Sequence, residues 1–220
     1  MSAKASLATY VRRLVHDVKG QCSAEGCGAI ESIVKGLAHK VGDEVVGVLA
    51  ASGAKTVTLD AMLAATRLTF IDCPGTDELV REMQMAVARY EATSGGSRET
   101  PVSAAARADV ITPPTRAFDV VCHTHKFARV SMQAKVAAAA LVDFLIAALV
   151  DPAVEEAAKA GHARITGKDV SRGVAASKML GAALGDATIR GGMTMGQVHA
   201  IAKRERAAAA RAKKSPRKSG

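Results

Sequence analysis

The sequence predicts an all-α protein built from two similar halves that fold face to face. In each half, a long segment with apolar residues at helical spacing precedes a loop of basic and β-branched residues. The loop leads into a shorter helix, at residues 55–68 and again at residues 163–176. Aromatic residues make up 3% of the chain and tryptophan is absent, so the core must consist of Ala, Val, Leu, Ile and Met. That composition favours helices over a β-sandwich.

The first half is expected to be a series of helices. Residues 6–17 form a short amphipathic helix, and a long helix follows from about residue 24 to residue 51. The glycines of the long helix each cost about 1 kcal/mol relative to alanine, so tertiary packing must hold it. Thr58 is expected to cap a third helix that ends near Leu68, and Thr76 to cap a fourth.

The second half follows a segment that lacks periodicity. Residues 94–113 contain Gly, Ser and Pro clusters, which predict a linker. A short helix is expected from Thr115 to about His123, and a long helix from about Ala134. Pro152 is expected to kink or restart this long helix, because a proline inside a helix costs about 3 kcal/mol.

The C-terminal part of the sequence predicts a helix, then an extended stretch, then a basic tail. Thr166 and Asp169 form a capping-box pattern, which predicts a helix that ends near Leu180. The glycine-containing stretch Leu184–Val198 looks extended. Residues 203–220 are basic and rich in alanine, and we expect them to order only on binding.

The net charge of +9 is unevenly distributed. Residues 203–220 contain eight basic residues and one acidic residue, so +7 of the charge lies in this tail and +2 in the rest of the chain. A basic tail on a nearly balanced body indicates nucleic acid as the partner, with an anionic membrane surface as the other candidate. The scarcity of aromatic residues counts against the stacking platforms that bind single strands.

The apolar segments predict a soluble intracellular protein. No N-terminal run resembles a signal peptide. The longest apolar stretch, Val136–Val150, is interrupted by Asp143 and is too short to span a bilayer.

Neither a metal site nor an enzyme is expected. The four cysteines (Cys22, Cys27, Cys73 and Cys122) do not make a disulfide scaffold in a chain of this size. Cys22 and Cys27 can be combined on paper with His123 and His125, but the spacing is wrong for a zinc knuckle. His16 and Asp17 lie near Cys22 in sequence, yet no catalytic spacing converges.

The order of short motifs resembles the core histones. The first half matches a 2B-type histone and the second half a 2A-type histone through these segments: Thr56-Val57-Thr58, Ala64–Leu68, Pro74-Gly75 and Ala88–Tyr90, then Arg116, Arg129-Val130, Leu141–Leu145, Ala163–Ile165, Leu184-Gly185 and Thr188–Gly192. The fused order is similar to that of the doublet histones encoded by Marseillevirus-like large DNA viruses. The resemblance implies two tandem histone folds that form an intramolecular handshake. They comprise a 2B-like fold at 1–93, a linker at 94–113, a 2A-like fold with a docking segment at 114–198, and a basic tail at 199–220.

The resemblance also implies where DNA binds. A histone-fold pair brings the first loop of one half beside the second loop of the other and presents helix N-termini to phosphates. We expect Arg164 beside Lys19 and Ser23, and Arg129 beside Lys55 and Thr56. Arg129 and Arg164 are the best candidates for entering a narrowed minor groove, as arginines of the cellular histone octamer do. The complete predicted DNA-binding set is Arg12, Arg13, Lys19, Ser23, Lys55, Thr56, Arg116, Arg129, Arg164, Lys213, Lys214, Arg217 and Lys218.

The implied function is packaging of double-stranded DNA without base specificity, in nucleosome-like particles that compact a viral genome. No cofactor, membrane or small-molecule substrate is implied. The expected locations are the virion and either the viral factory or the host nucleus. A 4–3-type histone doublet, or an equivalent tetramer, is the implied protein partner. The docking residues would be Ile189, Gly191, Gly192, Met193 and Gln197. The alternative is a regulatory histone-fold module of the transcription or replication machinery, which would need neither the docking segment nor the tail.

Two departures from the family pattern bear on function. The 2A-type histones carry an acidic cluster that docks chromatin factors. Asp143 and Asp151 match this cluster, whereas four other positions expected to be acidic are Ala148, Ser177, Lys178 and Met179. The charge of only +2 outside the tail predicts a looser grip on DNA than that of a cellular octamer.

Overall fold

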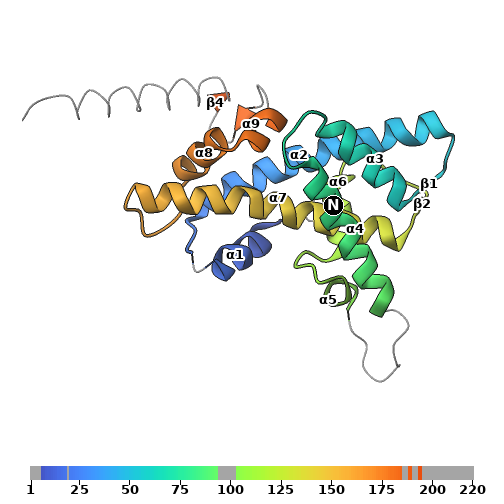
Figure 1. Cartoon of the computed structure of the whole chain (residues 1–220), viewed down its shortest axis with the longest axis horizontal. Helices are drawn as coiled ribbons and strands as arrows, with labels where there is room; N and C mark the ends of the chain where they lie inside the picture. Colours follow the sequence, from blue (N-terminus) through green and yellow to red (C-terminus); the bar gives the residue numbers. More distant parts are fainter. Residues whose placement is uncertain (1–5, 19, 94–102, 185–187, 190–192, 195–220) are drawn as a thin grey trace, which may run out of the picture.

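The computed structural model describes residues 6–18, 20–93, 103–184, 188–189 and 193–194, and most of this described chain is helical (Figure 1). The expectation of a mostly helical protein is confirmed. The helices are α1 (Ala8–Asp17), α2 (Ala24–Ser52), α3 (Leu59–Thr69), α4 (Thr76–Ala92), α5 (Ala104–Ala108), α6 (Pro114–Val121), α7 (Met132–Lys159), α8 (Gly167–Ala176) and α9 (Lys178–Leu184). The short strands are β1 (Thr56–Val57), β2 (Arg129–Val130), β3 (Thr188–Ile189) and β4 (Met193–Thr194).

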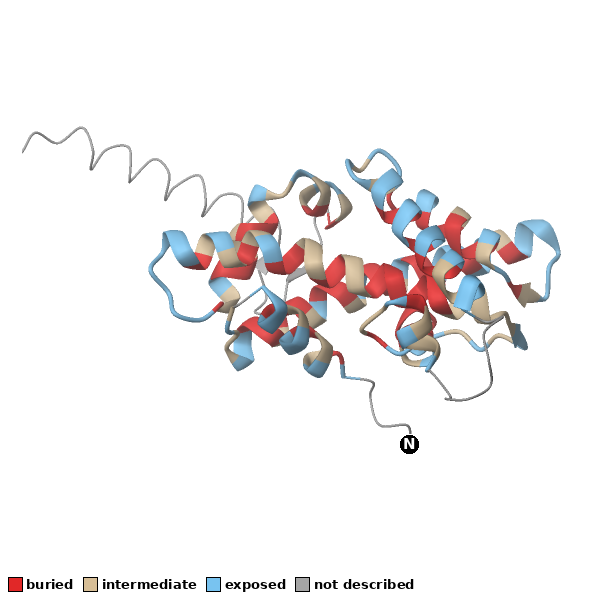
Figure 2. Ribbon diagram, turned by 60° about the horizontal axis from the view of Figure 1, so that its bottom comes forward, coloured by how far each residue is buried: buried red, intermediate tan, exposed pale blue. Residues whose placement is uncertain are grey.

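The two long helices, α2 and α7, form the centre of the molecule. They run across it in opposite directions, with shorter helices around them (Figure 1). Helix α7 packs against α1, α2, α3 and α4 as well as against α6 and α8. Ile30 and Leu37 on α2 are completely buried, as are Leu141 and Leu145 on α7. One hydrophobic cluster therefore contains residues from both halves, and Figure 2 shows its buried residues gathered along the central helices.

Helix α7 is long and apolar enough to cross a membrane by length and composition alone, with a mean hydropathy of 2.0 over its most apolar window. The expectation that this stretch is too short was therefore wrong, because the helix extends beyond Val136–Val150 at both ends. However, 67% of that window is buried inside the protein. A helix that is apolar all round and covered by neighbours on several sides is what the core of a globular fold requires.

Serine or threonine side chains cap the N-termini of α2, α3 and α7. Ser23, Thr58 and Ser131 each accept a hydrogen bond from the backbone N–H three residues later, which satisfies one free amide of the first turn. The expected cap at Thr58 is confirmed. The expected cap at Thr76 is wrong, because Gly75 occupies the cap position with a φ of 89°. The Thr76 hydroxyl instead donates to the carbonyl oxygens of the preceding turn.

Two expected helix boundaries in the second half are also corrected. Helix α7 continues through Pro152, so the expected restart is wrong. Helix α8 packs closely here: a Cβ at Gly173 would lie 2.9 Å from the Pro152 carbonyl carbon. The next helix ends at Ala176 rather than near Leu180, because Ser177 adopts an extended conformation. The Ser177 hydroxyl oxygen accepts the Leu180 N–H and so begins α9.

The predicted linker contains structure of its own. Ser103 caps the short helix α5, and the following segment is fastened to α7 by Asp143. The Asp143 carboxylate accepts hydrogen bonds from the backbone N–H groups of Ile111, at 2.6 Å, and Thr112, at 3.2 Å. The expected extended stretch after Leu184 is described only at β3 and β4, which pair antiparallel with Ile189 opposite Met193.

Candidate nucleic-acid interface

Strands β1 and β2 bring the loop after α2 beside the loop before α7. The two strands are parallel, with Thr56 opposite Arg129 and Val57 opposite Val130. The Ser131 N–H extends the pairing by donating to the Val57 carbonyl oxygen at 2.9 Å. Lys55 and Arg129 are both exposed. Two predicted DNA-binding residues from distant parts of the chain therefore lie side by side at this end of the molecule.

An equivalent pairing joins the loop before α2 to the loop after α7. Cys22 forms a parallel bridge with Ile165. Ile165 donates to the Gln21 carbonyl oxygen at 2.8 Å and accepts from the Ser23 N–H at 3.0 Å. The exposed Arg164 donates from Nε to the Gln21 side chain at 3.2 Å. Arg164 and Ser23 thus lie at the same end, while Lys19 falls outside the described residues.

Each pairing gathers two helix N-termini. Helices α3 and α7 begin beside β1 and β2, and helices α2 and α8 begin beside the Cys22–Ile165 bridge. A helix N-terminus carries a partial positive charge and unpaired amides, which together favour an anion such as a phosphate. The Ser23 hydroxyl oxygen accepts from Gly26 N–H, and its own hydrogen can still be donated to a phosphate.

The loop that carries Arg164 is held by a buried carboxylate. Asp169 is completely buried and accepts hydrogen bonds from the Thr166 N–H and the Thr166 hydroxyl. His162 Nδ1 lies 2.9 Å from the same carboxylate. Burial alone would raise the pKa of Asp169, but these hydrogen bonds outweigh it and lower the pKa. The expected capping box at Thr166 is confirmed, and it fixes the loop on which Arg164 stands.

Glycines allow the close approach of backbones at this end. A Cβ at Gly26 would lie 2.5 Å from the Ile165 carbonyl oxygen, so a larger residue would push α2 away from the loop. A Cβ at Gly167 would lie 2.8 Å from a carboxylate oxygen of Glu25. The acidic side chain of Glu25 therefore lies near the N-terminus of α8.

The middle of the predicted interface is formed by α1 and α6. Arg12 and Arg13 on α1 are exposed. Arg116 on α6 is half-buried, and its Nη2 donates to the Ser6 carbonyl oxygen at 3.0 Å. Its guanidinium carbon lies 5.8 Å from the ring centroid of Tyr10. Arg116 therefore joins the start of the first half to the second half, a role that sequence reasoning missed.

Several predicted residues lie outside the described part of the chain. They are Lys19, Gly191, Gly192, Gln197, Lys213, Lys214, Arg217 and Lys218. Of the predicted docking residues, Ile189 and Met193 are described only through the backbone pairing of β3 and β4. Their roles stay predictions.

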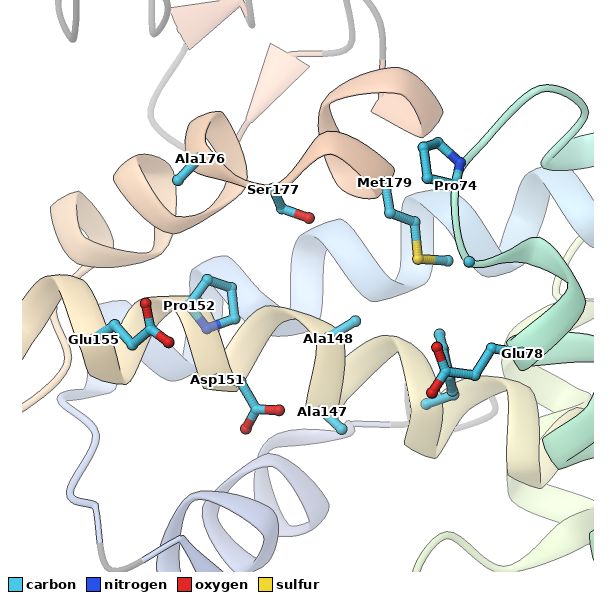
Figure 3. Close-up of a pocket in the computed structure, with 12 residues that line it drawn as sticks. Pro74, Glu78, Ala147, Ala148, Asp151, Pro152, Glu155, Ala176, Ser177 and Met179 are labelled. Atoms are coloured by element: carbon cyan, nitrogen blue, oxygen red, sulfur yellow. The ribbon is translucent and has the colours of Figure 1, made fainter.

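An open groove of about 600 Å³ lies between α7 on one side and the α3–α4 loop and the α8–α9 turn on the other (Figure 3). Asp151 lines it, together with Glu78 and Glu155. The expectation that Asp143 belongs to the same acidic cluster is wrong. Asp143 is absent from the groove lining, and its carboxylate accepts from Ile111 and Thr112. Burial raises the pKa of Asp143 despite these hydrogen bonds.

The cysteines and histidines weighed as a zinc site lie apart. Cys22 and Cys27 lie at the start of α2, and burial is the main reason that the pKa of Cys22 is raised. His123 stacks on His39 with ring centroids 5.3 Å apart, and His125 lies 2.7 Å from a carboxylate oxygen of Asp43. Cys27 and His39 are separated by about 18 Å along α2. No group of three metal-ligating side chains occurs among the described residues.

No protein-family model matches the chain, and no curated protein matches it.

Proposed function

We propose that this chain is a doublet histone, in which two fused histone folds form an intramolecular handshake and package double-stranded viral DNA without base specificity. The observation that carries the proposal is the reciprocal pairing of β1 with β2 and of Cys22 with Ile165. The first loop of each half meets the second loop of the other, which is the arrangement that a histone handshake requires. The motif order of the sequence supports the same conclusion.

The chemistry at the two ends supports DNA as the ligand. Each end combines paired helix N-termini with an exposed arginine, Arg129 at one and Arg164 at the other. These groups bind phosphates and enter the minor groove, and every duplex presents both whatever its sequence. The positive charge of the basic tail at 203–220 also favours DNA as the ligand. We further propose that the segment around β3 and β4 docks on a 4–3-type histone partner.

The proposal is tested by changing the two exposed arginines in the full chain. Arg164→Ala and Arg129→Ala should each weaken binding to unrelated duplex sequences alike. Each should also reduce the slope of log K against log salt by about 0.9 for every phosphate that the variant no longer neutralises. Fluorescence anisotropy of labelled duplexes at several salt concentrations measures both quantities. Reconstitution with a 4–3-type histone, followed by nuclease protection, tests the packaging step.

Arg81→Ala is the matched control, because Arg81 is an exposed arginine on α4, away from both loop pairings. It removes the same charge and should leave the affinity and the salt slope nearly unchanged. Equal effects of all three substitutions would mean that only net charge matters, which would contradict the assigned interface. A wild-type chain that binds no DNA would favour the alternative, a regulatory histone-fold module.

A further inference from the structure

One acidic side chain, that of Glu31, contacts the same residue, Ser6, as the predicted DNA-binding residue Arg116. The central cluster consists of Ser6, Leu7, Glu31, Lys35 and Arg116, where the start of α1 meets α2 and α6. The Glu31 carboxylate accepts hydrogen bonds from the Leu7 N–H at 3.1 Å, the Ser6 hydroxyl at 3.4 Å and Lys35 Nζ at 2.7 Å. Three donors thus converge on one carboxylate beside the N-terminus of α1.

This carboxylate occupies a place that suits a phosphate oxygen. A backbone N–H before a helix, a hydroxyl and an ammonium group are the donors that proteins use for phosphates. Arg116 approaches from α6 and donates to the Ser6 carbonyl oxygen, while its Nε is buried and has no hydrogen-bond partner among the described residues. The central cluster is therefore an oxyanion-binding arrangement that already contains an anion of the protein itself.

Glu31 lies on the same helix as the predicted contact at Ser23, about two turns further along α2. It follows Ser23 by eight residues, which corresponds to about 12 Å along the helix and about 80° around it. Its side chain is 16% exposed, and that of Lys35 is 28% exposed, so the pair borders solvent. Burial would raise the pKa of Glu31, but its hydrogen bonds to Lys35, Leu7 and Ser6 outweigh burial and lower the pKa.

We propose that Glu31 is a built-in competitor for a DNA phosphate, which withholds Lys35 and the N-terminus of α1 from the nucleic acid. The inference rests on the proposed DNA-binding function and deepens it. The protein then grips DNA at its two ends, through the loops of Arg129 and Arg164, and holds the middle weakly. Glu31 thereby limits affinity, in addition to the low charge of the chain outside its tail.

The test compares two substitutions that remove the same charge from the same helix. Glu31→Gln keeps an oxygen for the Leu7 N–H but releases Lys35, so the chain should still fold. Glu44→Gln is the control, because Glu44 is exposed and lies about 140° around α2 from Glu31. Salt screens interactions beyond about 8 Å at physiological ionic strength, so a remote charge should have little effect on DNA.

Binding of the full-length variants to a labelled duplex is measured by anisotropy across a salt series. E31Q should bind about 2- to 5-fold more tightly than wild type, the range that one exposed ion pair provides. Its salt slope should be steeper by about 0.9, because one more phosphate is neutralised. E44Q should match wild type in both quantities. Adding Lys35→Ala to E31Q should restore the wild-type slope, since Lys35 is the released group.

The outcomes separate this inference from the proposed function. E31Q that behaves like E44Q, or that binds more weakly than wild type, overturns the role of Glu31 even where Arg164→Ala and Arg129→Ala weaken binding. A gain that survives the addition of Lys35→Ala overturns the role of Lys35. Absence of the arginine effects alone overturns the assigned ends of the interface. A wild-type chain without DNA affinity overturns both the proposed function and this inference.

Discussion

At the scale of single residues, buried polar groups decide how the loops are held. Asp143 and Asp169 both accept hydrogen bonds from loop residues, yet their pKa values move in opposite directions. Burial dominates at Asp143, whereas hydrogen bonds from Thr166 and His162 dominate at Asp169. The first fastens the segment before α6 to α7, and the second fixes the loop of Arg164. Neither carboxylate is available as a surface charge, so they add nothing to an acidic docking surface.

His39 should make the stability of the protein depend on pH. Burial is the main reason that its pKa is lowered, and His123 and Lys35 act in the same direction, while Asp43 opposes them. The unfolded chain therefore binds a proton more readily than the folded chain below the unfolded pKa of about 6.5. The contribution of neutral His39 to the free energy of unfolding is fully present above that pH. It should be lost as the pH drops from about 6.5 through the folded pKa of His39.

Urea unfolding at several pH values measures this effect. His39→Gln should flatten the decline in the free energy of unfolding as the pH falls below about 6.5. His16→Gln, which replaces an exposed histidine on α1, is the matched control and should retain the wild-type decline. An unchanged decline in H39Q would show that other groups carry the pH dependence.

At the scale of elements, glycines in α2 have different roles. A Cβ at Gly42 would collide with the carbonyl oxygen of Val121 at the end of α6. A Cβ at Gly36 would meet nothing within 4 Å. The first glycine permits two helices to cross closely, whereas the second only lowers the helix propensity of α2.

The two glycines give a matched prediction. Gly42→Ala should destabilise the protein by about 1–3 kcal/mol, because the backbone of α6 must move. Gly36→Ala should stabilise it by about 0.5–1 kcal/mol through helix propensity and the unfolded state. Chemical denaturation at neutral pH measures both changes. Equal changes of the same sign would show that α2 and α6 do not need their close crossing.

At the scale of the whole molecule, the two halves share one hydrophobic core. Helix α7 packs against α1, α2, α3 and α4, and Leu141, Leu145 and Leu149 are at most 1% exposed. Exposing a buried leucine costs about 1.5–3 kcal/mol. Three such residues therefore represent an energy comparable with the entire stability of a typical domain, about 5–15 kcal/mol.

The separate halves should consequently fail to fold alone. Fragments 1–95 and 110–220 should show no cooperative unfolding as monomers, and mixing them should restore helicity and a cooperative transition. Circular dichroism and size-exclusion chromatography measure both properties. A fragment that is monomeric and unfolds cooperatively would show that the halves are independent domains.

Several local features of this protein follow from short stretches of its sequence. The apolar spacing predicted α2 and α7, and the residue types at Thr58 and Thr166 predicted two helix starts, because cap hydrogen bonds span only three residues. The repeated pattern predicted two halves of similar order. The same local rules failed at Thr76 and Pro152, where a glycine with positive φ and close packing against α8 decide the outcome.

The resemblance predicted which loops meet, whereas the individual contacts between distant groups follow from the tertiary packing. Arg164 lies beside Gln21 across 143 positions of sequence, and Arg116 reaches Ser6 across 110. In the sequence, Glu31 is one of several polar residues on a long helix. The packing of α1 against α2 brings the Leu7 N–H and the Ser6 hydroxyl to its carboxylate. Such contacts depend on how the core orients whole helices. Burial of the apolar faces of α2 and α7 fixes those orientations. The sequence around Arg116, Arg164 or Glu31 therefore does not reveal which distant residue each one contacts.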